Sequence, residues 1–221
     1  MKTIDVALVC VYYDSKKLQA RVQAQRADEL SGAAVLAPSV VARIGVANHE
    51  ATWTALKSTS VAVDGAEVIR HDNSGMEFGA YQAGLDRLLA DHDPEWVLFA
   101  NDTFATHHSF GTVYRRKLAA ETGRGHAVPA IIGQVVYLPR SFTVEGLRTY
   151  RWISTNLFAL NREARRALDG RVYRDELNAR ITETSEMANF FRRRSTCSCA
   201  SIWRLGCSAP VRVGTGMHLT R

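Results

Sequence analysis

Apolar runs of different period divide the chain into strand-like and helix-like segments typical of an α/β fold. Residues 4–12 form a nearly continuous run rich in Val and Ile, as expected for a strand buried on both faces of a parallel sheet. The pattern predicts further strands at 33–36, 67–70 and 95–100 and helices at 17–30 and 47–57. We therefore expect a mostly parallel sheet flanked by helices.

The clearest helical pattern follows a loop at residues 71–75, with the sequence HDNSG. These residue types tolerate left-handed backbone geometry or cap helices. Apolar residues then recur at helical spacing, at Phe78, Tyr81, Leu85, Leu88 and Leu89. Gly75 and Gly79 would let a backbone or a bound group approach closely. The loop either contacts a ligand or simply caps the helix, and the pattern leaves both interpretations open.

A second polar segment ends the strand at 95–100, after Asp93-Pro94 interrupts the chain. It consists of Asn101, Asp102 and Thr103. The carboxyl ends of parallel strands share one edge, where open α/β sheets bind ligands, so we expect Asp102 near the 71–75 loop. A carboxylate there can hold Mg²⁺ or Mn²⁺. The alternative is an Asp that caps the following turn.

The pattern after residue 150 predicts one more strand and helix. Apolar residues alternate over 152–160 as in a strand, and Asn161 is placed to cap a helix that contains Ala164 and Leu168. We expect this strand to join the same sheet.

Length and composition favour one sizeable domain, since the chain has 221 residues and 46% hydrophobic content. No apolar stretch approaches the roughly 20 residues that span a bilayer, and charge appears too early for a signal peptide. Cys10 lies alone in an apolar run, and the other three cysteines form no even disulfide framework. We therefore expect a cytoplasmic protein.

The net charge of +6 is concentrated at the end of the chain. Residues 192–221 contain six arginines and no Asp or Glu, which leaves 22 basic and 22 acidic residues before them. A neutral body lacks the basic face that duplex binding needs, so we expect no nucleic-acid partner. The shift predicts a domain at 1–191 and a basic, Cys-containing tail at 192–221, whose cysteines fit no standard zinc spacing.

Two segments together resemble a known family. DNSGMEFGAYQAGL at 72–85 and WVLFANDTF at 96–104 are similar to the Asn-x-Gly-x-Asp/Glu-Phe-Gly and Asn-Asp-Ser/Thr segments of rhamnan-synthesis-type glycosyltransferases. These enzymes build cell-surface polysaccharides, and the wider similarity is to glycosyltransferases of the GT-A fold. The resemblance covers 4–191, more weakly after residue 130, and implies a single GT-A-like (Rossmann-like) domain.

The resemblance also implies a site for a nucleotide-sugar at the end of the first strand. Matched to the donor site are Tyr12, Asp14, Asn73, Gly75, Glu77 and Asn101. Asp102 matches the acidic motif that holds Mg²⁺ or Mn²⁺ against the diphosphate. The usual Asp-x-Asp is here reduced to one carboxylate, which leaves metal dependence open.

Sugar transfer by direct displacement needs a carboxylate to take the proton of the acceptor hydroxyl. Glu183 and Glu186 lie three residues apart and would share a helix face, a spacing that a solvated helix also shows. Arg148, Arg151 and Arg162 suit binding of a diphosphate, although ordinary surface arginines have the same pattern.

These observations predict an enzyme that moves a sugar from a nucleotide-sugar to a glycan or lipid-linked acceptor. A lipid-linked acceptor would bring the chain to the inner face of the membrane as a peripheral protein. The alternative is a catalytically inactive GT-A-like domain that binds nucleotide or glycan, or supports an assembly. A dinucleotide-binding enzyme is disfavoured because no Gly-x-Gly-x-x-Gly follows the first strand.

Overall fold

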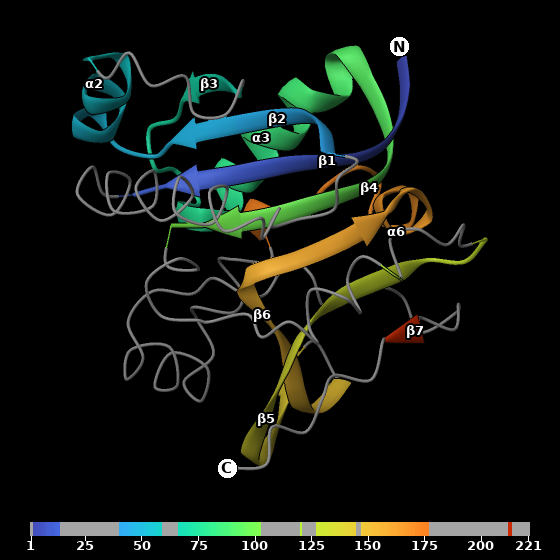
Figure 1. Ribbon diagram of the computed structural model, residues 1–221. Coiled ribbons are helices and arrows are strands. Elements are labelled where there is room, and N and C mark those ends of the chain that lie inside the picture. Colours follow the sequence, from blue (N-terminus) through green and yellow to red (C-terminus); the bar gives the residue numbers. More distant parts are fainter. Residues whose placement is uncertain are drawn as a thin grey trace, which may run out of the picture.

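The computed structural model describes residues 2–13, 40–58, 66–102, 120, 127–144, 147–176 and 212–213. A seven-stranded sheet is flanked by helices (Figure 1). The strands are β1 (Lys2–Tyr12), β2 (Val40–Ala47), β3 (Glu67–Arg70), β4 (His92–Asn101), β5 (Ala130–Val144), β6 (Leu147–Asn161) and β7 (Arg212–Val213). The helices are α2 (Glu50–Ser58), α3 (Met76–Asp91) and α6 (Arg162–Ala167). The predicted helix at 17–30 and strand at 33–36 lie outside the described residues.

The strand order is β3-β2-β1-β4-β6-β5-β7. Strand β1 pairs in parallel with β2 and β4, β2 pairs in parallel with β3, and β7 does so with β5. Strand β6 is antiparallel to both β4 and β5, so it runs against the other six, as its arrow in Figure 1 shows. The predicted class, a mostly parallel Rossmann-like α/β sheet flanked by helices, is confirmed.

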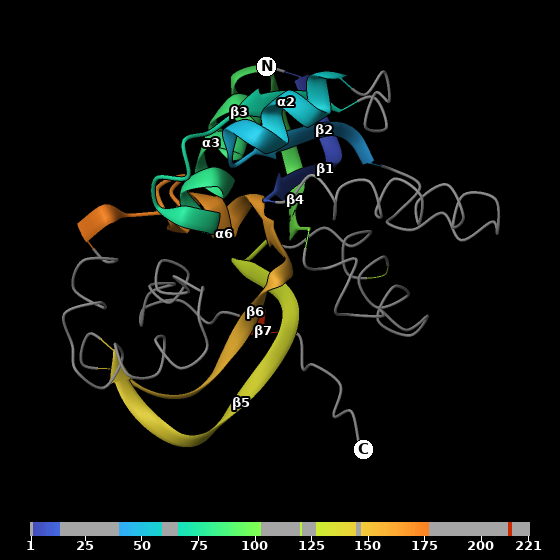
Figure 2. The ribbon, with the colours of Figure 1, turned by 90° about the vertical axis from the view of Figure 1, so that its left-hand side faces the viewer.

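The core lies on both faces of this sheet, because successive residues of a strand point to opposite sides. In β1, Val9 and Val11 face helices α3 and α6, whereas Cys10 and Tyr12 belong to the cluster on the other face. Trp53 of α2 packs against that second cluster. Farther along, β5 and β6 curve away together beyond the parallel strands (Figure 2).

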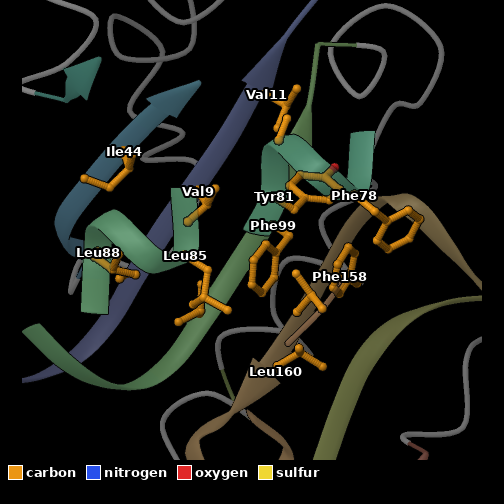
Figure 3. Close-up of a cluster of buried hydrophobic side chains, with 14 of the residues drawn as sticks. Val9, Val11, Ile44, Phe78, Tyr81, Leu85, Leu88, Phe99, Phe158 and Leu160 are labelled. Carbon is orange, nitrogen blue, oxygen red and sulfur yellow. The ribbon is translucent and has the colours of Figure 1, made fainter. Parts of the chain in front are cut away.

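Tyr81 is the centre of the core under α3 (Figure 3). Its ring meets Phe78, Phe99 and Phe158 edge to face, with centroids 5.9, 5.4 and 5.6 Å away. Phe99 and Phe158 stack on each other at 4.8 Å across the β4–β6 pair. This geometry is favourable for aromatic pairs and fixes the first turns of α3 over β4 and β6.

The sequence predicted several elements closely and misjudged others. The helix after Gly75, the strand at 67–70 and the cap at Asn161, whose Oδ1 accepts from the Ala164 amide at 2.8 Å, are confirmed. Strand β2 was missed, because a helix was predicted to begin at residue 47. Asp93-Pro94 does not interrupt the chain: β4 begins at His92, and Pro94 is tolerated because β6 pairs with β4 only from Trp96 onward.

Part of the predicted tail belongs to the sheet. Arg212 and Val213 pair with Ala130 and Ile131 of β5. The proposed domain boundary near residue 192 stays a prediction. Among the described helices, none has the length and apolar character needed to cross a membrane.

The approach of α3 to the sheet gives a test of this packing. A Cβ added at Gly84 would overlap Cγ1 of Val9 and lie 2.9 Å from Cγ2 of Val46. We expect Gly84→Ala to lower the free energy of unfolding by about 1–3 kcal/mol, measured by urea denaturation, because the core there has no room. An exposed helical glycine would instead gain roughly 0.5–1 kcal/mol from the same change, and a gain at Gly84 would contradict the packing described.

Candidate active site

The carboxyl ends of β1 and β4 form the point where the strand order changes direction. From β1 the chain passes to β2 and β3 on one side, while β4 lies on the other. The Asp102 amide donates to the Val11 carbonyl at 3.0 Å, which extends the β1–β4 pairing to the strand ends. Such a reversal is where open α/β sheets bind ligands.

Asp102 holds the exit of β1 in place. Its Oδ2 accepts a hydrogen bond from the Tyr13 amide at 2.9 Å, and the residue is only 1% exposed. The Tyr13 carbonyl in turn accepts from the Thr52 hydroxyl of α2 at 2.9 Å. Asp102 therefore has a structural role between two strand ends, whatever else it binds.

Glu77, in the first turn of α3, is the other buried acid at this edge. Its residue is 6% exposed, and Oε1 has no hydrogen-bond partner among the described residues. Burial raises the pKa of Glu77 to about 7 and the charge of Asp102 adds to the rise, while the polar side chains of Thr155, Asn101 and Tyr81 oppose it. Near neutral pH the carboxyl is therefore protonated in part of the population.

Strand β6 adds polar groups that the sequence did not single out. The Asn101 amide donates from Nδ2 to Oδ1 of Asn156 at 3.3 Å, and the Tyr81 hydroxyl donates to the Thr155 carbonyl at 2.9 Å. In the sequence Thr155 and Asn156 are ordinary polar positions of an alternating strand. Only the antiparallel pairing of β6 with β4 brings them beside Asn101.

Asn48, directly after β2, links the loops that surround the site. It is fully buried, and its Nδ2 donates to Asn73 Oδ1 at 2.8 Å and to the Met76 carbonyl at 3.3 Å. Its Oδ1 lies 2.6 Å from Nδ1 of His71, and its backbone N–H donates to the Tyr12 carbonyl at 3.0 Å. Asn48 was not predicted from the sequence, because β2, the strand that it follows, was itself missed.

The turn into α3 is left-handed at three residues. The φ angles are 66° at Asn73, 63° at Gly75 and 54° at Met76. A Cβ at Gly79 would overlap the Ser74 carbonyl, so this glycine allows the backbone of the turn to approach the helix. Left-handed backbone in residues other than glycine is costly and persists where the surroundings fix it, here through Asn48.

Of the other residues predicted for the site, some lie at this edge, one lies away from it and several are outside the described residues. Tyr12 is buried at 3% exposure on the face opposite α3, so its carbonyl, and not its ring, lies at the edge. Tyr13, the next residue, is half-buried, and its ring lies 5.8 Å from that of His49. Arg162 pairs with acids at the amino end of β4, away from Asp102. Outside the described residues are Asp14, Thr103, Glu183 and Glu186.

The donor set at this edge bears on the predicted metal. In the described ranges no three His, Cys, Asp or Glu residues lie close enough to hold a metal ion. Mg²⁺ in nucleotide enzymes is often held by one or two carboxylates together with substrate phosphates. The described residues do not form an all-protein cage, and Asp102, whose Oδ2 accepts from the Tyr13 amide, would be one carboxylate ligand of such a shared site.

No family model and no curated protein sequence matches the chain. Solved structures with similar folds include three nucleotide-related enzymes. A 4-diphosphocytidyl-2C-methyl-D-erythritol synthase gives a TM-score of 0.48 at 13% identity, over 100% of this chain and 93% of the other. The Francisella tularensis 2-C-methyl-D-erythritol 4-phosphate cytidylyltransferase gives 0.44 at 10%, over 98% and 94%. A CMP:2-keto-3-deoxy-manno-octonic acid synthetase complexed with CTP gives 0.41 at 10%, over 88% and 84%. Similarity at this level gives no information about the site or its chemistry.

The hydrogen bond from Tyr13 to Asp102 predicts different losses of stability for two substitutions at Asp102. Asp102→Ala would leave the Tyr13 amide without its acceptor, so we expect a loss of about 2 kcal/mol in the free energy of unfolding. Asp102→Asn keeps an oxygen in place and should lose less than about 1 kcal/mol. Urea denaturation of both variants measures this. Equal losses would mean that the bond does not hold the strand exit.

Glu77 predicts a stability that depends on pH. Its pKa is about 7 in the folded state against the usual 4.5, so the folded state keeps a proton that the unfolded state releases. This retained proton contributes about 3 kcal/mol to the free energy of unfolding. The contribution is complete below pH 4.5 and is lost as pH rises to about 7. Glu77→Gln does not titrate, so its stability relative to wild type should rise across that window in urea denaturation. A difference that stays constant with pH would contradict the burial of this carboxyl.

Proposed function

We propose that the chain is a glycosyltransferase that moves a sugar from a nucleotide-sugar to a glycan or lipid-linked acceptor in surface polysaccharide synthesis. The observation that carries this proposal is the meeting of Glu77 with Asn101 and Asp102 at one edge of the sheet. They come from the two separate segments that resemble glycosyltransferases. The edge lies at a change of strand direction, which supports a nucleotide ligand.

In this scheme each part of the edge has a role. The nucleotide would lie against the exit of β1, near Tyr12 and Asp14. The proposed donor pocket is completed by Asn73, Gly75, Glu77 and Asn101. Asp102 would hold Mg²⁺ or Mn²⁺, which supplies neutralisation of the charge on the diphosphate leaving group. Glu183 or Glu186 would take the proton of the acceptor hydroxyl.

A second candidate is a domain that binds a nucleotide-sugar without transferring the sugar. It is favoured by the acidic motif, which has one carboxylate where the usual Asp-x-Asp has two, and by the hydrogen bond that occupies Oδ2 of Asp102. Both candidates require the same nucleotide site. They differ in whether the donor is consumed.

The test is a thermal-shift and calorimetric screen of the full chain with UDP-, GDP- and dTDP-sugars and CTP, each with and without MnCl₂. One nucleotide class should raise the melting temperature, because a ligand at 100 times its Kd stabilises the native state by about 2.7 kcal/mol. Asp102→Asn should lose the part that depends on Mn²⁺. The matched control is Asp86→Asn, which changes an exposed acid of α3 and should behave as wild type.

The outcomes separate the candidates. Stabilisation with release of free nucleotide in the presence of acceptor glycans supports the transferase. Stabilisation by a donor that stays intact supports the binding domain. If no nucleotide or nucleotide-sugar changes the melting temperature, both candidates are wrong.

A further inference from the structure

The carboxyl group of Glu77 combines deep burial with an oxygen that no described residue uses. Its residue is 6% exposed, yet Oε1 lacks a hydrogen-bond partner within the described ranges. Buried polar atoms in native proteins are nearly always hydrogen-bonded, and each exception calls for an explanation. A ligand group that completes the bond is such an explanation.

Three elements surround this carboxyl. The polar side chains that influence its pKa are Tyr81 on α3, Asn101 at the end of β4 and Thr155 in β6. Tyr81 belongs to the same core cluster as Val11, which lies near the carboxyl end of β1 (Figure 3). Glu77 therefore belongs to the ligand-binding edge of the sheet, on the side of β4 and β6.

The surroundings of Glu77 favour a neutral ligand group with both donor and acceptor capacity. The charged neighbour in its electrostatic environment is Asp102, so a phosphate would meet two acidic groups. A cation would need the deprotonated carboxyl, which burial disfavours. A hydroxyl can donate to the carboxylate and accept from the protonated acid, so it suits both states.

We propose that Oε1 of Glu77 forms a hydrogen bond with a hydroxyl of the donor's sugar, so that this residue distinguishes a nucleotide-sugar from the bare nucleotide. The inference rests on the proposed function and adds a specificity-determining role to it. The nucleotide itself would lie toward Tyr13 and His49, on the side of β1 and α2.

Two substitutions at Glu77 test the proposal in the full chain. The probes are UDP-glucose with UDP, GDP-mannose with GDP, and dTDP-glucose with dTDP, and the pair that binds wild type is used for calorimetry. Glu77→Met keeps a similar volume and removes the hydrogen bond, so nucleotide-sugar affinity should fall about tenfold while nucleoside diphosphate affinity changes less than about twofold. Glu77→Gln can still bond a hydroxyl and should stay within about threefold of wild type for both.

One control tests whether replacing an acid elsewhere on α3 affects binding, and another tests whether the variant is folded. Asp86→Asn should bind both members of the pair as wild type does. If circular dichroism shows that Glu77→Met is unfolded, Glu77→Asp replaces it. That variant withdraws the carboxyl by about 1.5 Å, the length of one C–C bond, and should show the same tenfold selective loss.

Several results would overturn the proposal. Equal weakening of nucleotide-sugar and nucleoside diphosphate would assign Glu77 a structural role only. Stabilisation of wild type by MnCl₂ alone, lost in both the Met and the Gln variants, would make Glu77 a cation ligand. If the pair binds and Glu77→Met changes nothing, this inference alone fails. If wild type binds no probe at all, the proposed function fails and the inference falls with it.

Discussion

The close packing of α3 on the sheet is the constraint on which the candidate site depends. Gly84 brings the helix backbone against Val9 and Val46, and Tyr81 anchors its first turns through edge-to-face contacts with Phe99 and Phe158. Protein interiors are packed densely enough that the helix cannot withdraw without leaving a cavity. The start of α3 is therefore fixed beside the end of β4, and with it the position of Glu77.

Polar groups at the edge of this core differ in how fully their hydrogen bonds are satisfied. Asn48 is completely buried, and both atoms of its side-chain amide have partners. Its role is structural, since it joins the end of β2 to the turn before α3. Glu77 is almost as buried, yet one of its oxygens lacks a partner in the described ranges. Unsatisfied buried groups lower stability, so the contrast supports a functional role for Glu77.

Much of the fold was predictable because its signals are local. The apolar run of β1, the helical spacing of α3 and the cap at Asn161 each depend on neighbours in sequence. Strand β2 was missed because its apolar residues run almost directly into α2, which blurs the two periods. Pro94 was misread as a break because its tolerance depends on where the pairing with β6 begins.

The candidate site was predictable only in part, for a related reason. The position of Asp102 at the edge where β1 ends could be predicted from strand ends alone. The partners Asn48, Thr155 and Asn156 could not, because they reach the site through pairings between distant segments. The position of β6 between β4 and β5 decides two of them, and no short motif specifies that position.

The pair of acids at this edge shows how burial shapes the chemistry that the sheet can offer. The sequence provides one carboxylate in its acidic motif, while α3 brings a second acid, Glu77, from 25 positions earlier in the chain. Two full negative charges beside each other would repel a diphosphate. Burial raises the pKa of Glu77 to about 7, so less negative charge accumulates next to Asp102 than two ordinary carboxylates would carry. Under the proposed function, this lower charge would allow an anionic donor to bind beside the two acids.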